Sequence, residues 1–138
     1  MANGFARSLG FALLFSLLAA GMASSEEQTF QATVGADGTQ HVDIVAGSYF
    51  FNPNRIIVKA NVPVQMTIRK EGGVVPHDIV LSAPDAGIDI KEELSRDAKT
   101  ITFTPTKPGT YVFYCDKKQP FGKSHRELGM TGVLEVVD

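Results

Sequence analysis

The sequence has only one cysteine, Cys115, and only three histidines among its 138 residues. A single cysteine excludes an intramolecular disulfide. It leaves open a bridge to a second chain, a small buried residue at a strand end, or a metal ligand. So few cysteines and histidines leave room for one transition-metal site at most, because these are the side chains that such ions prefer.

An excess of charge of either sign is also missing. The chain has 13 Lys and Arg against 15 Asp and Glu, which gives a formal net charge of −2. It contains no long basic run, no glycine-rich phosphate-binding loop and no internal repeat. These absences argue against a nucleic-acid-binding function. At 43% hydrophobic and 20% charged residues, the composition is that of an ordinary folded domain, and the length suits one domain.

Helical periodicity is almost absent after Glu26. Short runs rich in β-branched and aromatic residues recur instead, separated by Gly, Pro, Asn and Asp. Two of these runs alternate apolar and polar residues, which indicates strands with one buried and one solvated face. We therefore predict an all-β domain, either a two-sheet sandwich or a barrel. The predicted strands cover residues 29–34, 40–46, 55–59, 64–69, 77–81, 99–104, 110–114 and 132–137.

The segment from residue 83 to residue 97 is less regular. It is compatible with a loop, and residues 90–95 within it could form one helical turn or a short edge strand.

The first two dozen residues differ from the rest. Arg7 is the only charge before an apolar run over residues 9–20, and small residues follow up to Ala23. This arrangement is typical of a secretory signal peptide. An uncleaved membrane anchor is the alternative, but a span needs ~20 apolar residues. We therefore predict a signal peptide over residues 1–23, a domain over 24–138, a periplasmic or otherwise exported location, and no stable membrane insertion after cleavage.

Four side chains could together bind a soft transition metal. His77 follows Pro76 at the start of a predicted strand, and Cys115 ends an aromatic strand. His125 lies ten positions after the cysteine, and Met130 follows five positions later. A thiolate and two imidazoles, with a thioether as a weak axial ligand, form the type 1 copper pattern. Zn(II) at a site of one Cys and two His is a lesser possibility.

Each of these side chains also has a purely structural interpretation. The cysteine and Met130 could simply fill the core, and the two histidines could lie at the surface or be satisfied inside it. His41 and Met66 lie in predicted strands without a comparable motif. We expect neither of them to bind metal.

The order of these motifs resembles the cupredoxin family, the plastocyanin-like and azurin-like type 1 copper proteins. The resemblance covers most of the chain after residue 24. It implies a Greek-key two-sheet sandwich of about seven to eight strands, with one mononuclear copper ion held by the four side chains above. The matching pieces are Tyr49-Phe50-Phe51-Asn52-Pro53, Pro76-His77, Pro108-Gly109, Thr110-Tyr111-Val112-Phe113-Tyr114-Cys115, His125 and Gly129-Met130-Thr131-Gly132.

Two features depart from the usual family pattern. The spacing Cys-x9-His-x4-Met puts nine residues between Cys115 and His125, where many small blue copper proteins have fewer. Longer loops occur in copper nitrite reductases. In addition, Asp78 stands where the family usually has Asn after the first histidine. A carboxylate accepts hydrogen bonds from backbone N–H groups, and its charge favours Cu(II). We expect both departures to alter the reduction potential more than copper binding.

The resemblance implies a one-electron carrier that exchanges electrons through an exposed edge of His125. The alternative is a copper-binding protein for tolerance, trafficking or sensing. An oxidase or nitrite reductase would need further copper centres, for which only His41 remains, so we expect no enzymatic activity.

Basic residues surround His125 in the sequence. They could steer an acidic redox partner to the loop around this histidine, or they could form an ordinary solvated loop. We expect the protein to be a monomer. The basic residues are Lys117, Lys118, Lys123 and Arg126.

Overall fold

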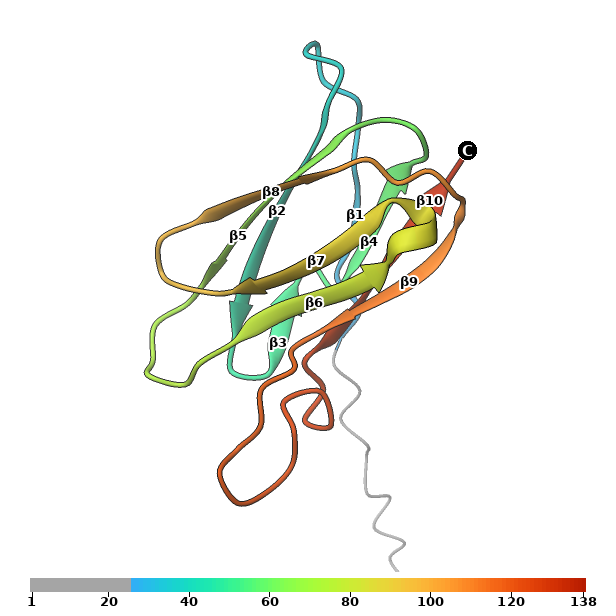
Figure 1. The fold of residues 1–138 in the computed structure, drawn as a ribbon. Coiled ribbons are helices and arrows are strands. Elements are labelled where there is room, and N and C mark those ends of the chain that lie inside the picture. Colours follow the sequence, from blue (N-terminus) through green and yellow to red (C-terminus); the bar gives the residue numbers. More distant parts are fainter. Residues whose placement is uncertain (1–25) are drawn as a thin grey trace, which may run out of the picture.

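The computed structural model describes residues 26–138, which form two β-sheets around a common core (Figure 1). The predicted signal peptide over residues 1–23 lies outside the described residues. Within residues 26–138, no helix has the length and apolar character needed to cross a membrane.

Ten strands and one short 3₁₀ turn, η1 (Pro84–Ala86), make up the regular structure of residues 26–138. The six-stranded sheet has the order β1 (Thr29–Gln31), β4 (Arg55–Lys59), β10 (Thr131–Val137), β9 (Gly109–Tyr114), β6 (Asp78–Ala83) and β7 (Ile88–Glu93). The four-stranded sheet has the order β3 (Phe50–Asn52), β2 (Gln40–Gly47), β5 (Val64–Lys70) and β8 (Lys99–Phe103). Both sheets are mixed, because β10 runs parallel to β4 and antiparallel to β9, and β2 runs parallel to β5.

The predicted all-β two-sheet sandwich is confirmed, but it has ten strands where seven to eight were expected. All eight predicted strands are present, with ends shifted by a few residues. The additional strands are β3 and β7. The irregular segment after residue 83 forms η1 and then β7, an edge strand that pairs antiparallel with β6 along its length.

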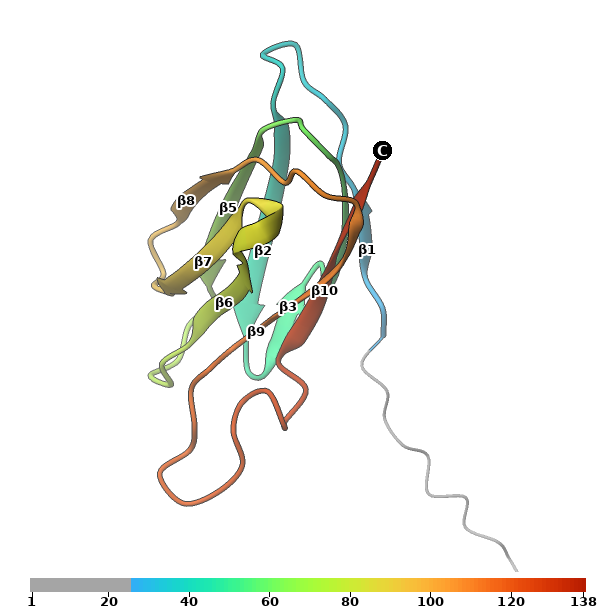
Figure 2. The same cartoon turned by 45° about the vertical axis from the view of Figure 1, so that its right-hand side comes forward.

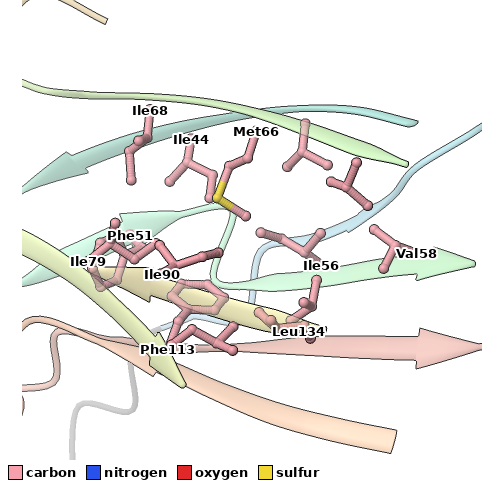
Figure 3. Close-up of a cluster of buried hydrophobic side chains, with 14 of the residues drawn as sticks. Ile44, Phe51, Ile56, Val58, Met66, Ile68, Ile79, Ile90, Phe113 and Leu134 are labelled. Atoms are coloured by element: carbon pink, nitrogen blue, oxygen red, sulfur yellow. The ribbon is translucent and has the colours of Figure 1, made fainter. Parts of the chain in front are cut away.

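The core lies between the sheets and follows from the alternation in the sequence (Figure 3). On β5, the apolar residues Val64, Met66 and Ile68 are buried, while the residues between them are only partly covered. Burying one large aliphatic side chain stabilises a fold by roughly 1.5–3 kcal/mol. Met66 is fully buried in this core, in line with the packing role expected for it.

Phe113 and Gly132 show how closely the last two strands are fitted together. The Phe113 ring packs edge-on against Phe51 of the other sheet, with ring centroids 5.2 Å apart. Gly132 lies opposite Phe113 on β10. A Cβ atom at Gly132 would collide with the Phe113 ring and would lie 2.7 Å from the carbonyl oxygen of Asn54. The second glycine of the Gly-Met-Thr-Gly motif is therefore required by the close approach of the aromatic ring.

Three connections gather at one end of the sandwich (Figures 1 and 2). They are the turn between β2 and β3, the loop between β5 and β6, and the long loop between β9 and β10. His77 directly precedes β6, Cys115 directly follows β9, and Met130 directly precedes β10. Because β9 pairs with both β6 and β10, the sheet brings these three positions to the same end.

Candidate metal centre

Three of the predicted ligands converge on a common point. Sγ of Cys115 lies 3.4 Å from Nδ1 of His125 and 4.0 Å from Nδ1 of His77, and the two Nδ1 atoms are 3.2 Å apart. Ligands bound at about 2.0–2.3 Å to one tetrahedral ion would be separated by roughly 3.3–3.8 Å. The observed spacing therefore suits a single ion between the three atoms. No other group of three or more His, Cys, Asp or Glu side chains with this potential occurs within residues 26–138.

All three side chains are withdrawn from solvent. Cys115 is 0% exposed, His125 is 1% exposed and His77 is 5% exposed. His41 lies instead at the surface, where its Nε2 atom is 2.8 Å from the carboxylate of Asp37. The third histidine is therefore outside the cluster, as expected.

Met130 is joined to the cluster through the backbone. Its own N–H donates to the carbonyl of His125 at 2.9 Å, and its carbonyl accepts from the N–H of Cys115 at 3.1 Å. The N–H of His125 donates in turn to the carbonyl of Lys117 at 2.8 Å. The Met130 side chain is fully buried and belongs to the same core cluster as Cys115. These backbone hydrogen bonds thus fix Cys115, His125 and Met130 relative to one another, although nine residues separate the cysteine from the histidine.

A compact turn presents His125. The Ser124 hydroxyl accepts a hydrogen bond from the N–H of Glu127 at 3.2 Å, and the Glu127 carboxylate accepts from the N–H of Ser124 at 2.7 Å. This reciprocal pair is a capping box, which fixes the start of a helical turn. The two donors of Ser124 hold the pKa of Glu127 below its usual value. The turn ends at Gly129, whose φ of 99° favours glycine.

Asp78 ties the first histidine to the cysteine-bearing loop. Its N–H points to Sγ of Cys115 at 3.5 Å, and its Oδ1 atom accepts a hydrogen bond from the N–H of Asp116 at 2.6 Å. Its other oxygen lies 3.9 Å from Nζ of Lys117, which also bonds to the carboxylate of Glu93. The expectation that an aspartate can make this link by accepting a backbone hydrogen bond is therefore confirmed.

Burial shifts the ionisation of all three candidate ligands. It raises the pKa of the Cys115 thiol to about 11, although the N–H of Asp78 opposes the shift. Burial also lowers the pKa of His125, and lowers that of His77 together with the nearby charge of His125. At neutral pH the metal-free site therefore holds a thiol and two neutral imidazoles. A metal ion would release the thiol proton on binding, because thiolate is the ligand form.

The lowered imidazole pKa values predict that the metal-free protein loses stability in acid. Below the usual histidine pKa of about 6.5, the unfolded chain binds protons that the folded site does not, so acidification favours unfolding. We expect the melting temperature to fall by on the order of 5 °C between about pH 7 and pH 5. Calorimetry of the metal-free protein measures this change. The variant His41→Gln, which removes the surface histidine, should retain the decline, whereas His77→Gln should reduce it. A flat profile in this range would contradict the prediction.

The expected exposed edge of His125 is not found. A tyrosine covers this histidine: the ring of Tyr49 meets the imidazole nearly edge-on, with centroids 4.9 Å apart. The centroid of the His77 ring lies 6.3 Å from the centroid of the same tyrosine ring. A groove of about 600 Å³ lies at this contact, lined by Tyr49 and His125 together with residues 74–76 and 118–121. The prediction failed because the turn between β2 and β3, distant in sequence, supplies the covering ring.

Sequence comparison decides the family. A family model of the cupredoxin-like domain matches residues 10–124. The chain belongs to the cupredoxin-like family. This cupredoxin is 30% identical over 132 residues to the chloroplastic plastocyanin of Oryza sativa subsp. indica, covering 91% of this chain and 71% of the relative. It is also 30% identical over 102 residues to the plastocyanin of Dryopteris crassirhizoma, covering 65% of this chain and 90% of the relative.

Solved structures show the same cupredoxin fold. The metal-binding domain of the Streptococcus pneumoniae Cu(I)-exporting P-type ATPase CopA, determined with Cu(I), superimposes with a TM-score of 0.61 at 21% identity. It covers 82% of this chain, which spans 99% of that domain. Reduced auracyanin from Roseiflexus castenholzii gives a TM-score of 0.56 at 24% identity, with 75% of this chain and 100% of that chain covered.

The family and the donor set agree on copper as the cofactor of this cupredoxin. A buried sulfur and two imidazole nitrogens, with a buried methionine beside them, fit the soft ligand set of a type 1 copper ion. Two further residues support these ligands in ways that the sequence did not predict. Tyr49 covers His125, and Lys117 accepts its backbone hydrogen bond. The Ser-x-x-Glu spacing over 124–127 was a readable capping-box signal, but nothing in the sequence alone placed the tyrosine beside the imidazole.

Proposed function

We propose that this chain is an exported one-electron carrier. In this proposal His77, Cys115 and His125 bind one type 1 copper ion, and Met130 is the weak axial ligand. The single observation that carries the proposal is the convergence of a thiol sulfur and two imidazole nitrogens, all within 4.8 Å of one another, inside a β-sandwich. The plastocyanin relatives support the same role.

The chain's own residues account for fast electron exchange. Copper, when bound, supplies a change between Cu(I) and Cu(II). The strands and the backbone hydrogen bonds of the 115–130 segment hold the donor atoms in a fixed array, so little rearrangement accompanies a change of charge. The burial of all three donors excludes water, which would otherwise compete as a ligand. The proposal assigns no catalysed reaction, because His41 lies at the surface, outside the only such cluster in residues 26–138.

A redox partner would dock at the groove beside His125. Val74 is 96% exposed and Phe121 is 100% exposed, so apolar surface lies on both sides of this groove. Lys118 and Lys123 are exposed nearby and would favour an acidic partner. Lys117 is engaged with Glu93, and the guanidinium of Arg126 lies 4.3 Å from the centroid of the Tyr114 ring. We propose that the partner meets a monomer here, after removal of residues 1–23.

Optical and EPR spectra of the copper-loaded chain from residue 24 onward, followed by a redox titration, test the proposal. We expect an intense thiolate-to-Cu(II) absorption band, one copper per chain, and a reversible one-electron transition. A protein that binds copper without the thiolate band would overturn the ligand assignment.

A copper-handling role is the second candidate. The observation in its favour is the burial of His125, because an enclosed ligand set suits retention of an ion as well as electron exchange. The structural likeness to a Cu(I)-binding domain fits the same idea. Voltammetry separates the two candidates: slow, irreversible electron exchange combined with very tight Cu(I) binding would favour copper handling.

The charge of Asp78 is expected to lower the reduction potential. The buried carboxylate lies beside the cysteine loop and stabilises the higher charge of Cu(II). We expect Asp78→Asn to raise the potential by on the order of 50–100 mV, while the remaining amide oxygen still accepts the N–H of Asp116. Lys117→Gln should shift the potential in the opposite direction.

Asp116→Asn provides the matched control in the same redox titration. Its carboxylate is next to Cys115 in sequence, but its side chain is 55% exposed and faces Lys91 at 3.9 Å, so solvent screens it. Equal shifts for the Asp78 and Asp116 variants would show that the buried carboxylate has no special influence.

A further inference from the structure

Tyr49 adopts a backbone conformation that is unfavourable for a bulky residue. Its φ angle is 66°, in the left-handed region, at the turn between β2 and β3. A large side chain with a positive φ is a genuine outlier, and such strain persists only where the surroundings hold it. Other contacts must therefore keep this tyrosine in place.

Those contacts are with the metal centre and with the long ligand loop. The ring packs edge-on against His125 and reaches His77. The amide of Gln119 donates a hydrogen bond to the phenol oxygen at 2.7 Å. Gln119 lies at the tip of the loop, which closes on itself through a β-bridge between Lys118 and Ser124. The tyrosine is thus joined at its ring to the ligands and at its hydroxyl to the loop.

The consequence is that a histidine on a surface loop is only 1% exposed. The groove beside it is lined by the imidazole and the tyrosine, by Gln119 and by exposed apolar residues such as Phe121. Within this groove the tyrosine ring packs against the imidazole, and only 1% of the histidine remains exposed to a small molecule. Without the ring, more of the imidazole would face the groove.

We propose that Tyr49, held by Gln119, is a cover that keeps water and small anions away from the copper centre. It is a positioning residue that restricts the site to electron exchange by denying an additional ligand access. The proposal rests on the copper site described under Proposed function. The long loop after the cysteine then has a definite role, because it supplies the hydrogen bond that holds the cover closed.

Thiol accessibility in the copper-free protein gives the first test. Cys115 is the only cysteine, so its reaction with iodoacetamide under native conditions reports access to this site alone. Tyr49→Gly removes the ring while glycine adopts the positive φ freely. We expect its alkylation rate to rise by about tenfold or more, and Gln119→Ala to give a smaller rise. Phe121→Ala removes a fully exposed ring that lines the same groove, and it should leave the rate unchanged. Equal rates for all variants and the parent would overturn the proposal.

Anion binding to the copper-loaded protein gives the second test. We expect azide to leave the EPR spectrum of the parent and of Phe121→Ala unchanged, and to create a new copper signal in Tyr49→Gly. Tyr49→Phe, which keeps the ring and loses the hydrogen bond, should match Gln119→Ala. Azide binding to the parent protein would contradict the proposal that Tyr49 blocks access to the copper centre.

The two assays separate the possible failures. If the protein binds no copper, the proposed function fails, while the alkylation rates still decide whether the tyrosine covers the site. If Tyr49→Gly does not fold, the proposal is tested by comparing Gln119→Ala with Phe121→Ala in both assays. Equal results for these two variants would overturn it.

Discussion

Replacement of Cys115 with serine should abolish the intense visible absorption of the copper-loaded protein. The sulfur is the only thiol in the chain, lies 3.4 Å from the nearer imidazole nitrogen, and is the soft donor that favours copper. A serine hydroxyl has nearly the same size but is a hard, protonated donor. We expect copper affinity to fall by more than the ~100-fold that can follow loss of an outer hydrogen-bond partner. Absorption spectroscopy and a competitive copper titration measure both effects.

Histidine variants supply the matched control for this result. His125→Gln removes a donor from the cluster, whereas His41→Gln removes the surface histidine beside Asp37. The first should weaken copper binding and change the spectrum, and the second should change neither. If the band survived in Cys115→Ser, the sulfur would not be a ligand and the proposed centre would be wrong.

Among the substitutions proposed for this protein, Phe113→Ala should cause the largest decrease in the free energy of unfolding. The ring is fully buried, packs against Phe51 across the sheets, and covers Gly132 on the next strand. Phe→Ala substitutions at such sites cost about 3–5 kcal/mol, since the cavity collapses only partly. Phe113 also lies two residues before Cys115, so the site should loosen with the core. Denaturant unfolding of the copper-free protein measures the change in the free energy of unfolding.

Val112→Ala is the control on the same strand. Val112 points to the opposite face of β9 and is 46% exposed, so its truncation should cost far less than that of its neighbour. Comparable losses for the two variants would mean that the ring does not hold the two sheets together.

Most of the fold was predictable because the sequence alternates clearly. Val64, Met66 and Ile68 fall on one face of a strand, and the structure buries all three. The convergence of His77 and Cys115 was also predictable, because the motif order resembles that of a known family. Asp78 could be assigned its accepting role from the chemistry of a carboxylate alone.

The remaining features depend on contacts between segments far apart in sequence. The sequence did not identify β7 clearly as a strand, because it contains charged residues and only two apolar ones. Such a composition is common in edge strands. The covering of His125 could not be predicted, because Tyr49 lies 76 positions earlier and reaches it only after the sheets have paired. A residue's exposure is set by such tertiary contacts, so the expected open edge of the imidazole was wrong.

The position of β10 couples the metal centre to the closure of the six-stranded sheet. This strand lies inside the sheet, between β4 and β9, although it follows both of them in the sequence. Until β10 is inserted, the sheet has a gap and Met130 lacks the strand that directly follows it. Assembly of the proposed four-residue ligand set therefore requires β10 to be paired on both of its edges.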